Sequence, residues 1–305
     1  MSDTLGSILA EAAAALSAAG FNEPRRRARR LVAASFDLSP TELLSDPERT
    51  LEHLAVERLR GTIARIVGGE PMSRVLGWRE FWGLRFALSA DTLDPRPETE
   101  TLVEAVLRRF VDRTTPLNFL DLGTGTGCLL LALLSEFPAA IGVGVDIAAG
   151  AVVTARENAA VLGLAGRARF FVGDWSSALS GRFTVIVANP PYIAEVALAE
   201  LAPEVRLYDP RRALDGGKEG LVAYPSIAEN LPALLASGGI LAVEIGAGQA
   251  AAAAAILKAG GFLIDGIERD LAGIERCVVA RIDESDRAQV AAIGQKSLGM
   301  CRLPV

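Results

Sequence analysis

The sequence has few of the side chains on which many hydrolases and metalloenzymes depend. It contains a single histidine, His53, and three cysteines, Cys128, Cys277 and Cys301, which are far apart and form no CxxC pair. This scarcity argues against a histidine-based triad, a histidine-ligated metal, a zinc site and a disulfide framework. We therefore expect chemistry that uses other side chains and no metal.

Long hydrophobic runs are also missing. Although the chain is 50% hydrophobic, no run approaches the roughly 20 apolar residues needed to cross a bilayer. The N-terminal segment lacks the basic region and the cleavage site of a secretory signal. These absences predict a cytoplasmic protein that does not associate with a membrane.

The chain has no surplus of positive charge. Its formal net charge is −6 and its isoelectric point is about 5.1, whereas a protein whose main role is to hold nucleic acid usually has a basic surplus. Direct nucleic-acid binding is therefore disfavoured. One dense basic cluster, Arg25–Arg30, runs against this balance. It is either a solvated helix face or a contact for RNA or an acidic partner.

A length of 305 residues suggests two domains. In residues 1–67, apolar residues recur at near-helical spacing, which predicts a small helical bundle that forms an N-terminal domain. Residues 68–97 are rich in glycine, proline and aromatic residues and predict a linker with a β-hairpin near 81–88. Residues 98–284 form the second domain, and 285–305 are a C-terminal tail to which we assign no element.

From residue 98 onward, helical and extended patterns alternate, which is typical of βαβ units around a parallel sheet. The expected helices cover residues 98–110, 129–137, 151–162, 224–235 and 249–259. The expected strands cover residues 117–122, 141–147, 169–172, 184–188, 240–245, 262–268 and 276–282. Because the last two strands are consecutive, we expect them to form an antiparallel hairpin at the sheet edge. The second domain is therefore predicted to be α/β.

A glycine-rich turn follows the first of these strands. The motif begins at Asp121 and continues through Gly123, Thr124, Gly125, Thr126 and Gly127 into a helix. Glycine allows a tight turn and close approach of the backbone to a ligand at the carboxyl end of a strand, where open α/β sheets bind ligands. By itself the turn is a weak signal, because loop geometry alone also selects glycine.

The next two strands also end in polar or aromatic side chains. Asp146 stands where a carboxylate can accept both ribose hydroxyls of a nucleoside. Asp174 and Trp175 end the third strand, where the carboxylate can accept from an exocyclic amine and the ring offers a flat apolar contact to adenine. Each group alone could be structural, but three successive strand ends with fitting groups indicate a nucleoside-containing cofactor.

The fourth strand ends in Asn189, Pro190, Pro191 and Tyr192. The two prolines stiffen the backbone, so the Asn189 side-chain carbonyl and the Pro190 backbone carbonyl can together accept both N–H bonds of a planar –NH₂ group. Tyr192 can stack on that group. This arrangement suits a nitrogen whose lone pair is delocalised, because orientation and charge stabilisation then replace a base or a metal.

Together, these strand-end motifs resemble those of class-one S-adenosylmethionine-dependent methyltransferases that act on planar nitrogens. DNA adenine-N6 and ribosomal RNA guanine-N2 methyltransferases carry the same set, so the NPPY motif does not choose the substrate. Residues 71–84 (PMSRVLGWREFWGL) and 94–100 (DPRPETE) resemble stretches of the release factor glutamine methyltransferases. Further segments follow that family's order: Glu204-Val, Asp209-Pro, Ala213-Leu-Asp-Gly-Gly, Glu244-Ile-Gly and Arg269-Asp-Leu-Ala-Gly.

The resemblance implies a Rossmann-like class-one methyltransferase domain with a mostly parallel seven-stranded sheet, preceded by a small helical-bundle domain. It implies S-adenosyl-L-methionine as cofactor and S-adenosyl-L-homocysteine as product. The methyl acceptor would be the side-chain amide nitrogen (N5) of the glutamine in the Gly-Gly-Gln motif of class-one peptide chain release factors, which links the protein to translation termination. The helical domain would help to dock that protein partner.

The resemblance also implies roles for individual residues. Those expected to hold the cofactor are Gly123, Thr124, Gly125, Thr126, Gly127, Asp146, Asp174, Trp175 and Asn189. Those expected to form the substrate slot are Asn189, Pro190, Pro191 and Tyr192, with Asn189, Pro190 and Tyr192 as the catalytic group. Three more would line the methionine end of the cofactor: Arg96, Glu98 and Thr99.

Two other functions remain open at this point. A DNA or ribosomal RNA amino-group methyltransferase would use the same NPPY motif, and Arg25–Arg30 supports it, but the net charge of −6 argues against it. A binding module that has lost its chemistry would keep the cofactor residues, but it would not need an intact Asn189–Tyr192 motif.

Overall fold

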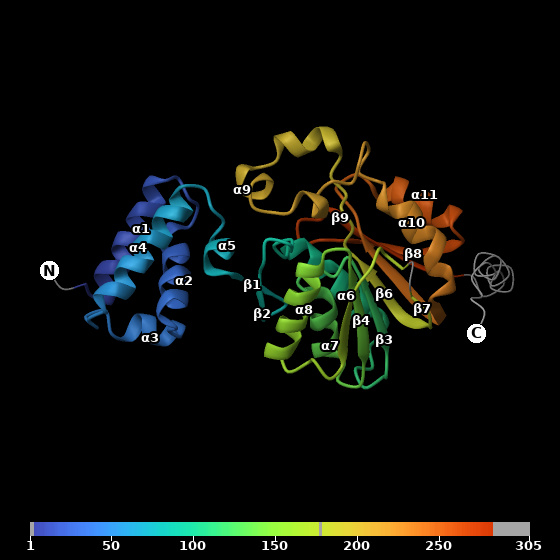
Figure 1. Cartoon of the computed structure of the whole chain (residues 1–305), viewed down its shortest axis with the longest axis horizontal. Coiled ribbons are helices and arrows are strands. Elements are labelled where there is room, and N and C mark those ends of the chain that lie inside the picture. The colour runs from blue at the N-terminus through green and yellow to red at the C-terminus, as the bar shows by residue number, and fades with distance from the viewer. Residues whose placement is uncertain (1–2, 177–178, 283–305) are drawn as a thin grey trace, which may run out of the picture. The chain divides into compact units, whose positions relative to one another are not determined.

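The computed structural model describes residues 3–176 and 179–282. Contacts divide the chain into two compact units (Figure 1). The helical unit comprises Met1–Trp78 and Ala202–Tyr208, and the α/β unit comprises Arg79–Leu201 and Asp209–Val305. The expected C-terminal tail, 285–305, lies outside the described residues.

The longer helices of the helical unit each bury one apolar face. Its elements are α1 (Leu5–Ala18), α2 (Pro24–Phe36), α3 (Pro40–Ser45), α4 (His53–Val67), α5 (Met72–Leu76) and α9 (Pro203–Arg206). In α1, Leu5, Ile8, Ala12 and Leu16 are buried, three or four residues apart, so they lie on one side of the helix. They pack with buried residues of α2, α3 and α4 in a separate hydrophobic core. The predicted N-terminal helical bundle is confirmed.

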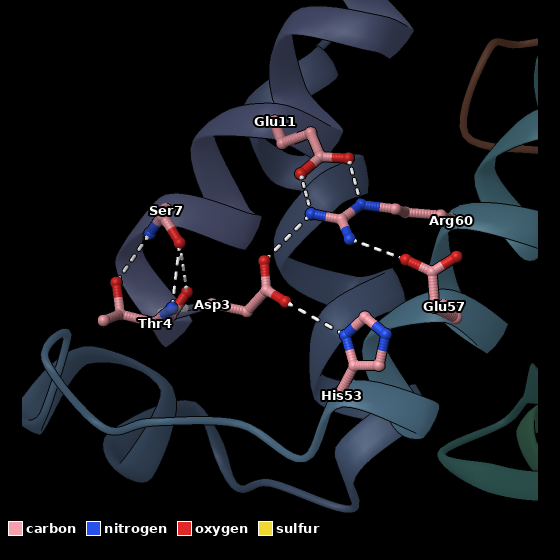
Figure 2. A network of polar contacts seen from close by, with 7 residues as sticks. All are labelled: Asp3, Thr4, Ser7, Glu11, His53, Glu57 and Arg60. Atoms are coloured by element: carbon pink, nitrogen blue, oxygen red, sulfur yellow. Dashed lines mark hydrogen bonds and ion pairs between the residues drawn. The ribbon is translucent and has the colours of Figure 1, made fainter. Parts of the chain in front are cut away.

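Arg60 of α4 forms ion pairs with the N-terminal segment, with α1 and within α4 (Figure 2). Its guanidinium contacts Glu11 of α1 at 2.8 Å, Glu57 at 2.8 Å and Asp3 at 3.0 Å. Asp3 also faces His53, with 3.7 Å between its Oδ2 and the imidazole Nδ1. The sole histidine of the chain therefore lies beside a surface network of ion pairs.

The hairpin expected near 81–88 forms as β1 (Trp78–Phe81) and β2 (Leu84–Ala87). Its two-residue turn, Trp82-Gly83, has φ values of 52° and 68°, as a tight hairpin turn requires at both positions. The Trp82 amide donates to Glu100 at 2.7 Å and its indole N–H donates to Glu136 at 2.7 Å. These bonds fix a tryptophan in a left-handed conformation and hold the hairpin on α6 (Glu100–Arg109) and α7 (Cys128–Glu136).

The α/β unit contains the predicted seven-stranded, mostly parallel sheet. Its strands are β3 (Asn118–Leu122), β4 (Ile141–Asp146), β5 (Ala168–Val172), β6 (Phe183–Ala188), β7 (Leu235–Glu244), β8 (Phe262–Arg269) and β9 (Glu275–Ile282). They lie in the order β5-β4-β3-β6-β7-β9-β8. The pairs from β5 to β7 are parallel, whereas β9 is antiparallel to both β7 and β8. The closing hairpin is thus confirmed, with β8 at the edge.

One helix is shorter than the sequence predicts. The helix expected over 224–235 is α10 (Ala223–Asn230), followed by a 3-10 turn at Leu231–Ala233 and by β7, which begins at Leu235. Pro232 is the reason, because proline has no N–H and cannot continue an α-helix. The early start of β7 includes an irregularity in its pairing with β6, between Phe183 and Val185.

Strand alternation produces the two buried faces of the sheet. Phe119, Val185 and Ala242 belong to one core cluster, with α6 (Glu100–Arg109), α7 (Cys128–Glu136) and α8 (Ala149–Val161). Their strand neighbours Leu120, Ile186 and Leu241 belong to the other, with α10 and α11 (Ala250–Ala259). Successive strand residues point to opposite faces, so helices cover both sides in the manner of a doubly wound fold. In the described ranges, every helix is too short or too polar to cross a membrane.

The order of the strands places one crevice at their carboxyl ends. From β3 the chain moves outward through β4 to β5, and it then returns to the other side of β3 with β6. The loops after the neighbouring strands β3 and β6 therefore lead in opposite directions along the sheet. Open α/β sheets bind ligands at such a switch point between adjacent strands. The glycine-rich loop and Asn189 follow these two strands.

Candidate active site

A cavity of about 310 Å³ opens at this switch point. Its lining includes most of the residues that the sequence predicts for the cofactor: Gly123, Thr124, Gly125, Thr126, Asp146, Asp174, Trp175 and Asn189. Arg96, Thr99 and Pro191 also line it, whereas Gly127, Glu98, Pro190 and Tyr192 do not. The volume lies at the lower end of the range for small-molecule sites.

The glycine-rich loop has the conformation that its sequence predicts. Gly123, Gly125 and Gly127 have φ values of 72°, 55° and 81°, a left-handed region that other residues adopt only at a cost. Gly127 is the residue before α7 and does not touch the cavity; a Cβ there would meet the side chains of Ala155 and Leu131 at 3.2 Å. Its role is close packing, and the ligand-facing part of the loop is 123–126.

Asp146 is the best-placed acceptor in the cavity. Its Oδ2 accepts from the Gly125 amide at 2.8 Å and its Oδ1 from the Ala148 amide at 2.9 Å. Desolvation raises the pKa of Asp146, and these backbone bonds oppose the rise. Each carboxylate oxygen still has a free lone pair, so the group can accept the two adjacent hydroxyls of a ribose.

Trp175 has a strained backbone at the edge of the cavity. Its φ of 48° is unusual for a bulky residue, and strain of this kind costs on the order of 1–3 kcal/mol. The ring is partly buried against one of the two sheet cores and also lines the cavity. Asp174 lies beside it and is exposed. The pair offers a flat apolar surface next to a carboxylate, as the sequence predicts for an adenine.

Asn189 faces the cavity from the end of β6. Its side-chain Nδ2 donates to the Thr99 hydroxyl at 3.2 Å. Thr99 belongs to the 3-10 turn η1 (Pro97–Thr99) and is buried. The distant segments that contain Thr99 and Asn189 thus meet at one point, where the PRPETE stretch adjoins the NPPY motif.

Tyr192, the last residue of the NPPY motif, contacts two residues outside the motif. The Tyr192 hydroxyl donates to Glu244 Oε1 at 3.2 Å, and the Gln249 side chain donates to the Tyr192 carbonyl at 2.9 Å. Glu244 ends β7 and is fully buried. Burial raises the pKa of Glu244 to about 7, while the hydroxyls of Thr99 and Tyr192 oppose part of the rise. The motif is therefore supported by a buried carboxyl group that our site prediction did not include.

A second buried carboxyl lies under the glycine-rich loop. Asp121 Oδ2 accepts from the Thr124 hydroxyl at 2.6 Å, and burial raises the pKa of Asp121 to about 7. Cys128 lines the cavity nearby, but desolvation raises the pKa of its thiol to about 12. The thiol is therefore protonated at neutral pH and is not an activated nucleophile.

Several lining residues come from loops that sequence reasoning did not mark. The mouth of the cavity includes Asp91 and Arg212, which form an ion pair. Arg96, which also lines the cavity, pairs with Asp209 at 2.5 Å. Asp209 is within the segments that carry the family resemblance, so a signal for it existed. Asp91 and Arg212 are 121 positions apart, and no local pattern connects them.

No three His, Cys, Asp or Glu side chains gather into a possible metal site within residues 3–176 and 179–282.

Comparison with known families and proteins agrees with this geometry. Residues 7–77 match the family model of the PrmC N-terminal domain, and residues 81–228 match that of the methyltransferase small domain. The first match covers most of the helical unit. The second covers the hairpin turn and β2, the cavity loops and the NPPY motif.

Curated relatives resemble the chain over most of its length. The release factor glutamine methyltransferase of Rhodospirillum rubrum is 51% identical over 277 residues, which cover 91% of this chain and 85% of the relative. The protein of the same name in Cereibacter sphaeroides is 44% identical, over 88% of this chain and 94% of the relative. Both alignments include far more than the part of the chain that holds the cofactor motifs.

Solved structures extend the likeness to the fold. The catalytic domain of hMettl16, solved in complex with the MAT2A 3′UTR hairpin 6, superposes with a TM-score of 0.56. It covers 70% of this chain and 82% of its own, at 15% identity. This likeness concerns the arrangement of the sheet and its helices.

Proposed function

Since this chain belongs to the release factor glutamine methyltransferase family, we propose that it methylates the side-chain amide nitrogen (N5) of a glutamine in a protein substrate. The substrate is the Gly-Gly-Gln motif of class-one peptide chain release factors. The cofactor is S-adenosyl-L-methionine, which leaves as S-adenosyl-L-homocysteine. The reaction takes place in the cytoplasm and modulates translation termination.

The cavity residues fit this cofactor. Asp146 has the free lone pairs to accept the ribose hydroxyls, because its present bonds use one site on each oxygen. Trp175 and Asp174 take the adenine, and residues 123–126 bring the backbone close to the ligand. Arg96 and Thr99 lie on the lining where the charged methionine end is expected. When bound, the cofactor supplies an electrophilic methyl group on a sulfonium.

Asn189 and Pro190 position the acceptor. The amide nitrogen of glutamine is a poor nucleophile because its lone pair is delocalised into the carbonyl. The Asn189 Oδ1 and the Pro190 carbonyl accept its two N–H bonds and fix its orientation toward the methyl group. As the N–C bond forms and the C–S bond breaks, these acceptors stabilise the positive charge on nitrogen, which then loses one proton to solvent. These steps require neither histidine nor a metal.

The observation that supports this proposal most is the 51% identity with the Rhodospirillum rubrum enzyme over 91% of the chain. It includes the helical unit, which matches the PrmC N-terminal domain. We propose that this unit docks the release factor. A base methyltransferase for DNA or ribosomal RNA would share the NPPY motif but would not need this unit, so that alternative is not favoured.

Mass spectrometry tests the reaction directly. A purified class-one release factor is incubated with the enzyme and S-adenosyl-L-methionine, and the peptide with the Gly-Gly-Gln motif is examined. We expect one added methyl group on the glutamine. An unmodified peptide, with cofactor binding verified by calorimetry, would contradict the proposal and direct the search to nucleic-acid substrates.

Two variants separate cofactor binding from chemistry. Asn189→Ala removes the acceptor, so methylation is expected to fall by at least about 100-fold while the dissociation constant for the cofactor changes little. Asp146→Ala removes the ribose acceptor, so the dissociation constant for the cofactor is expected to rise first. Normal turnover by Asn189→Ala would refute the mechanism.

A further inference from the structure

The orientation of the Asn189 amide decides whether the slot works. An asparagine side chain has an acceptor end and a donor end of nearly the same shape, and only its neighbours determine which end faces a ligand. To accept an N–H bond from the target amide, Asn189 must turn Oδ1 toward the cavity and Nδ2 away from it. The question is which group enforces that choice.

Thr99 is the neighbour that contacts Asn189. Its hydroxyl oxygen lies 3.2 Å from Asn189 Nδ2, and the residue is 2% exposed, so bulk water does not compete for it. A hydroxyl carries one proton. If that proton points at Asn189, the asparagine must present Oδ1 to it; if the proton points elsewhere, the oxygen accepts from Nδ2. The direction of the Thr99 proton therefore sets the orientation of Asn189.

Glu244 supplies the acceptor for that proton. Its carboxyl is fully buried, and Tyr192 donates to Oε1 at 3.2 Å. Oε2 is buried and has no hydrogen-bond partner. The hydroxyl of Thr99 is among the groups that lower the pKa of this carboxyl. An ionised carboxylate accepts and never donates. It therefore draws the protons of Thr99 and Tyr192 toward itself.

We propose that Glu244 is a positioning residue that acts on the target amide through Thr99 and Asn189. Its carboxylate takes the Thr99 proton, the Thr99 oxygen then accepts from Asn189 Nδ2, and Asn189 Oδ1 is left to accept from the glutamine amide. The inference rests on the proposed function, which supplies that amide. It assigns Thr99 a role in orienting Asn189, in addition to its place beside the cofactor.

The surroundings of Glu244 support a functional reason for its burial. A buried carboxylate is costly, and a well-packed apolar residue in its place is often no less stable. The titratable and charged groups around it come from five other segments: Glu98, Tyr192, Tyr224, Arg276, Cys277 and Cys128. Arg276, the one cation among them, is paired with Asp270 at 3.0 Å. The carboxylate therefore interacts mainly with the two hydroxyls of the site.

The position of Glu244 also predicts a pH dependence. Burial raises the pKa of Glu244 to about 7, so the carboxylate is lost as the pH falls through neutrality. A protonated carboxyl can donate to the Thr99 oxygen. The Thr99 proton is then free to point at Asn189 Oδ1, so that every donor and acceptor in the series Glu244, Thr99 and Asn189 is exchanged. The rate at saturating substrates is thus expected to fall below about pH 7 in the wild type.

Substitution of Thr99 tests the chain of bonds without changing its shape. Thr99→Val keeps the volume and removes the hydroxyl, whereas Thr99→Ser keeps the hydroxyl. We expect Thr99→Val to lower kcat on a class-one release factor by about 10- to 100-fold when the cofactor is saturating, with the KM for the release factor within a few-fold of the wild type. Thr99→Ser is expected to restore most of kcat. Thr101→Val, which removes another buried threonine hydroxyl two positions away, serves as the matched control.

Glu244→Gln completes the experiment, because the amide of the new side chain can donate to Thr99. The Thr99 hydroxyl can then donate to Asn189 Oδ1, which is the opposite hydrogen-bond direction to that in the wild type. We expect a lower kcat and the loss of the fall below about pH 7, with thermal stability measured for every variant. A folded Thr99→Val or Glu244→Gln enzyme with wild-type kcat and pH profile would overturn the inference. Equal losses in Thr99→Ser and Thr99→Val would also overturn it. If the wild type itself does not methylate the release factor, it is the proposed function that fails.

Discussion

Two buried carboxyl groups at the active site have consequences for stability. Asp121 is 1% exposed and Glu244 is 0% exposed, and one oxygen of each has no hydrogen-bond partner. Burial disfavours the charged form, so the pKa of each group is raised to about 7. In the unfolded chain both return to ordinary values near 4. The folded protein therefore binds more protons than the unfolded chain between about pH 4 and pH 7.

The first prediction is that the protein becomes less stable as the pH rises toward 8. Because the folded state binds more protons, the free energy of unfolding falls with increasing pH until both carboxyls have ionised. Between about pH 6 and pH 8, each group should remove on the order of 1 kcal/mol.

Urea unfolding at the two pH values measures this effect. Glu244→Gln cannot ionise, so the difference between pH 6 and pH 8 should shrink by about half, while Asp121 still contributes. A free energy of unfolding that rises over this range would contradict the prediction. So would an undiminished difference in the variant.

At the residue scale, the sequence identifies groups that stand at strand ends and little else of the site. Asp146 is the last residue of β4, Asp174 lies just beyond the end of β5 and Asn189 directly follows β6. The sheet topology brings all three to one cavity. Asp91 and Arg212 approach the same cavity from separate loops, and nothing in the local sequence indicates that they pair. Glu244 appears in the sequence only as part of the family resemblance; its burial beneath Tyr192 becomes visible in three dimensions.

At the element scale, α2 has an unusual arrangement of charge. Arg25, Arg26 and Arg27 lie in its first turn, where the helix dipole disfavours cations, and the helix has no acidic residue there and no side-chain cap. Arg25 and Arg29, four residues apart, repel each other on the helix surface. Arg26 pairs with Glu23 at 3.1 Å and Arg27 lies over the Phe21 ring. The arginine cluster thus costs the helix stability, so helix formation alone does not account for it.

The second prediction follows from this cost. Arg25→Glu places an acid at the positive end of the helix dipole and turns the repulsion with Arg29 into an attraction in the favourable order. We expect the unfolding free energy of the helical unit to rise by about 0.5–1.5 kcal/mol. Calorimetry measures the change, with Arg25→Gln as the control that removes the charge only. A lower melting temperature in Arg25→Glu than in Arg25→Gln would contradict the argument.

The ends of helices and strands are predicted well where several residues that favour a turn stand together, and less well where a single residue marks the end. The glycine-rich turn ends β3 at Leu122, as expected. By contrast, the helix that we extend to 235 ends at Asn230. Pro232 is a local signal for that end, and the predicted helix runs past it. Leu231, Leu234 and Leu235 are buried in the core, where Leu231 belongs to a 3-10 turn and Leu235 begins β7.

At the scale of the whole molecule, the chain has separate hydrophobic cores. The core of the helical unit is formed by residues of α1 to α4, with Leu31 of α2 fully buried in it. The α/β unit has its own two clusters, one on each face of the sheet. All the lining residues of the cavity belong to the α/β unit. The cofactor should therefore stabilise that unit directly.

The third prediction is that the cofactor shifts only part of the thermal unfolding of the full chain. A ligand that binds the folded form at about 100 times its dissociation constant adds about 2.7 kcal/mol to the stability of the unit that holds it. Leu31→Ala leaves a cavity in the helical core, at a cost of about 2–5 kcal/mol, and so identifies the transition of the helical unit. In scanning calorimetry we expect S-adenosyl-L-methionine to raise the other transition and to leave this one in place. A single transition that both the ligand and the substitution move would show instead that the two units unfold together. Cofactor binding would then stabilise the helical unit as well, although that unit contributes no residue to the lining of the cavity.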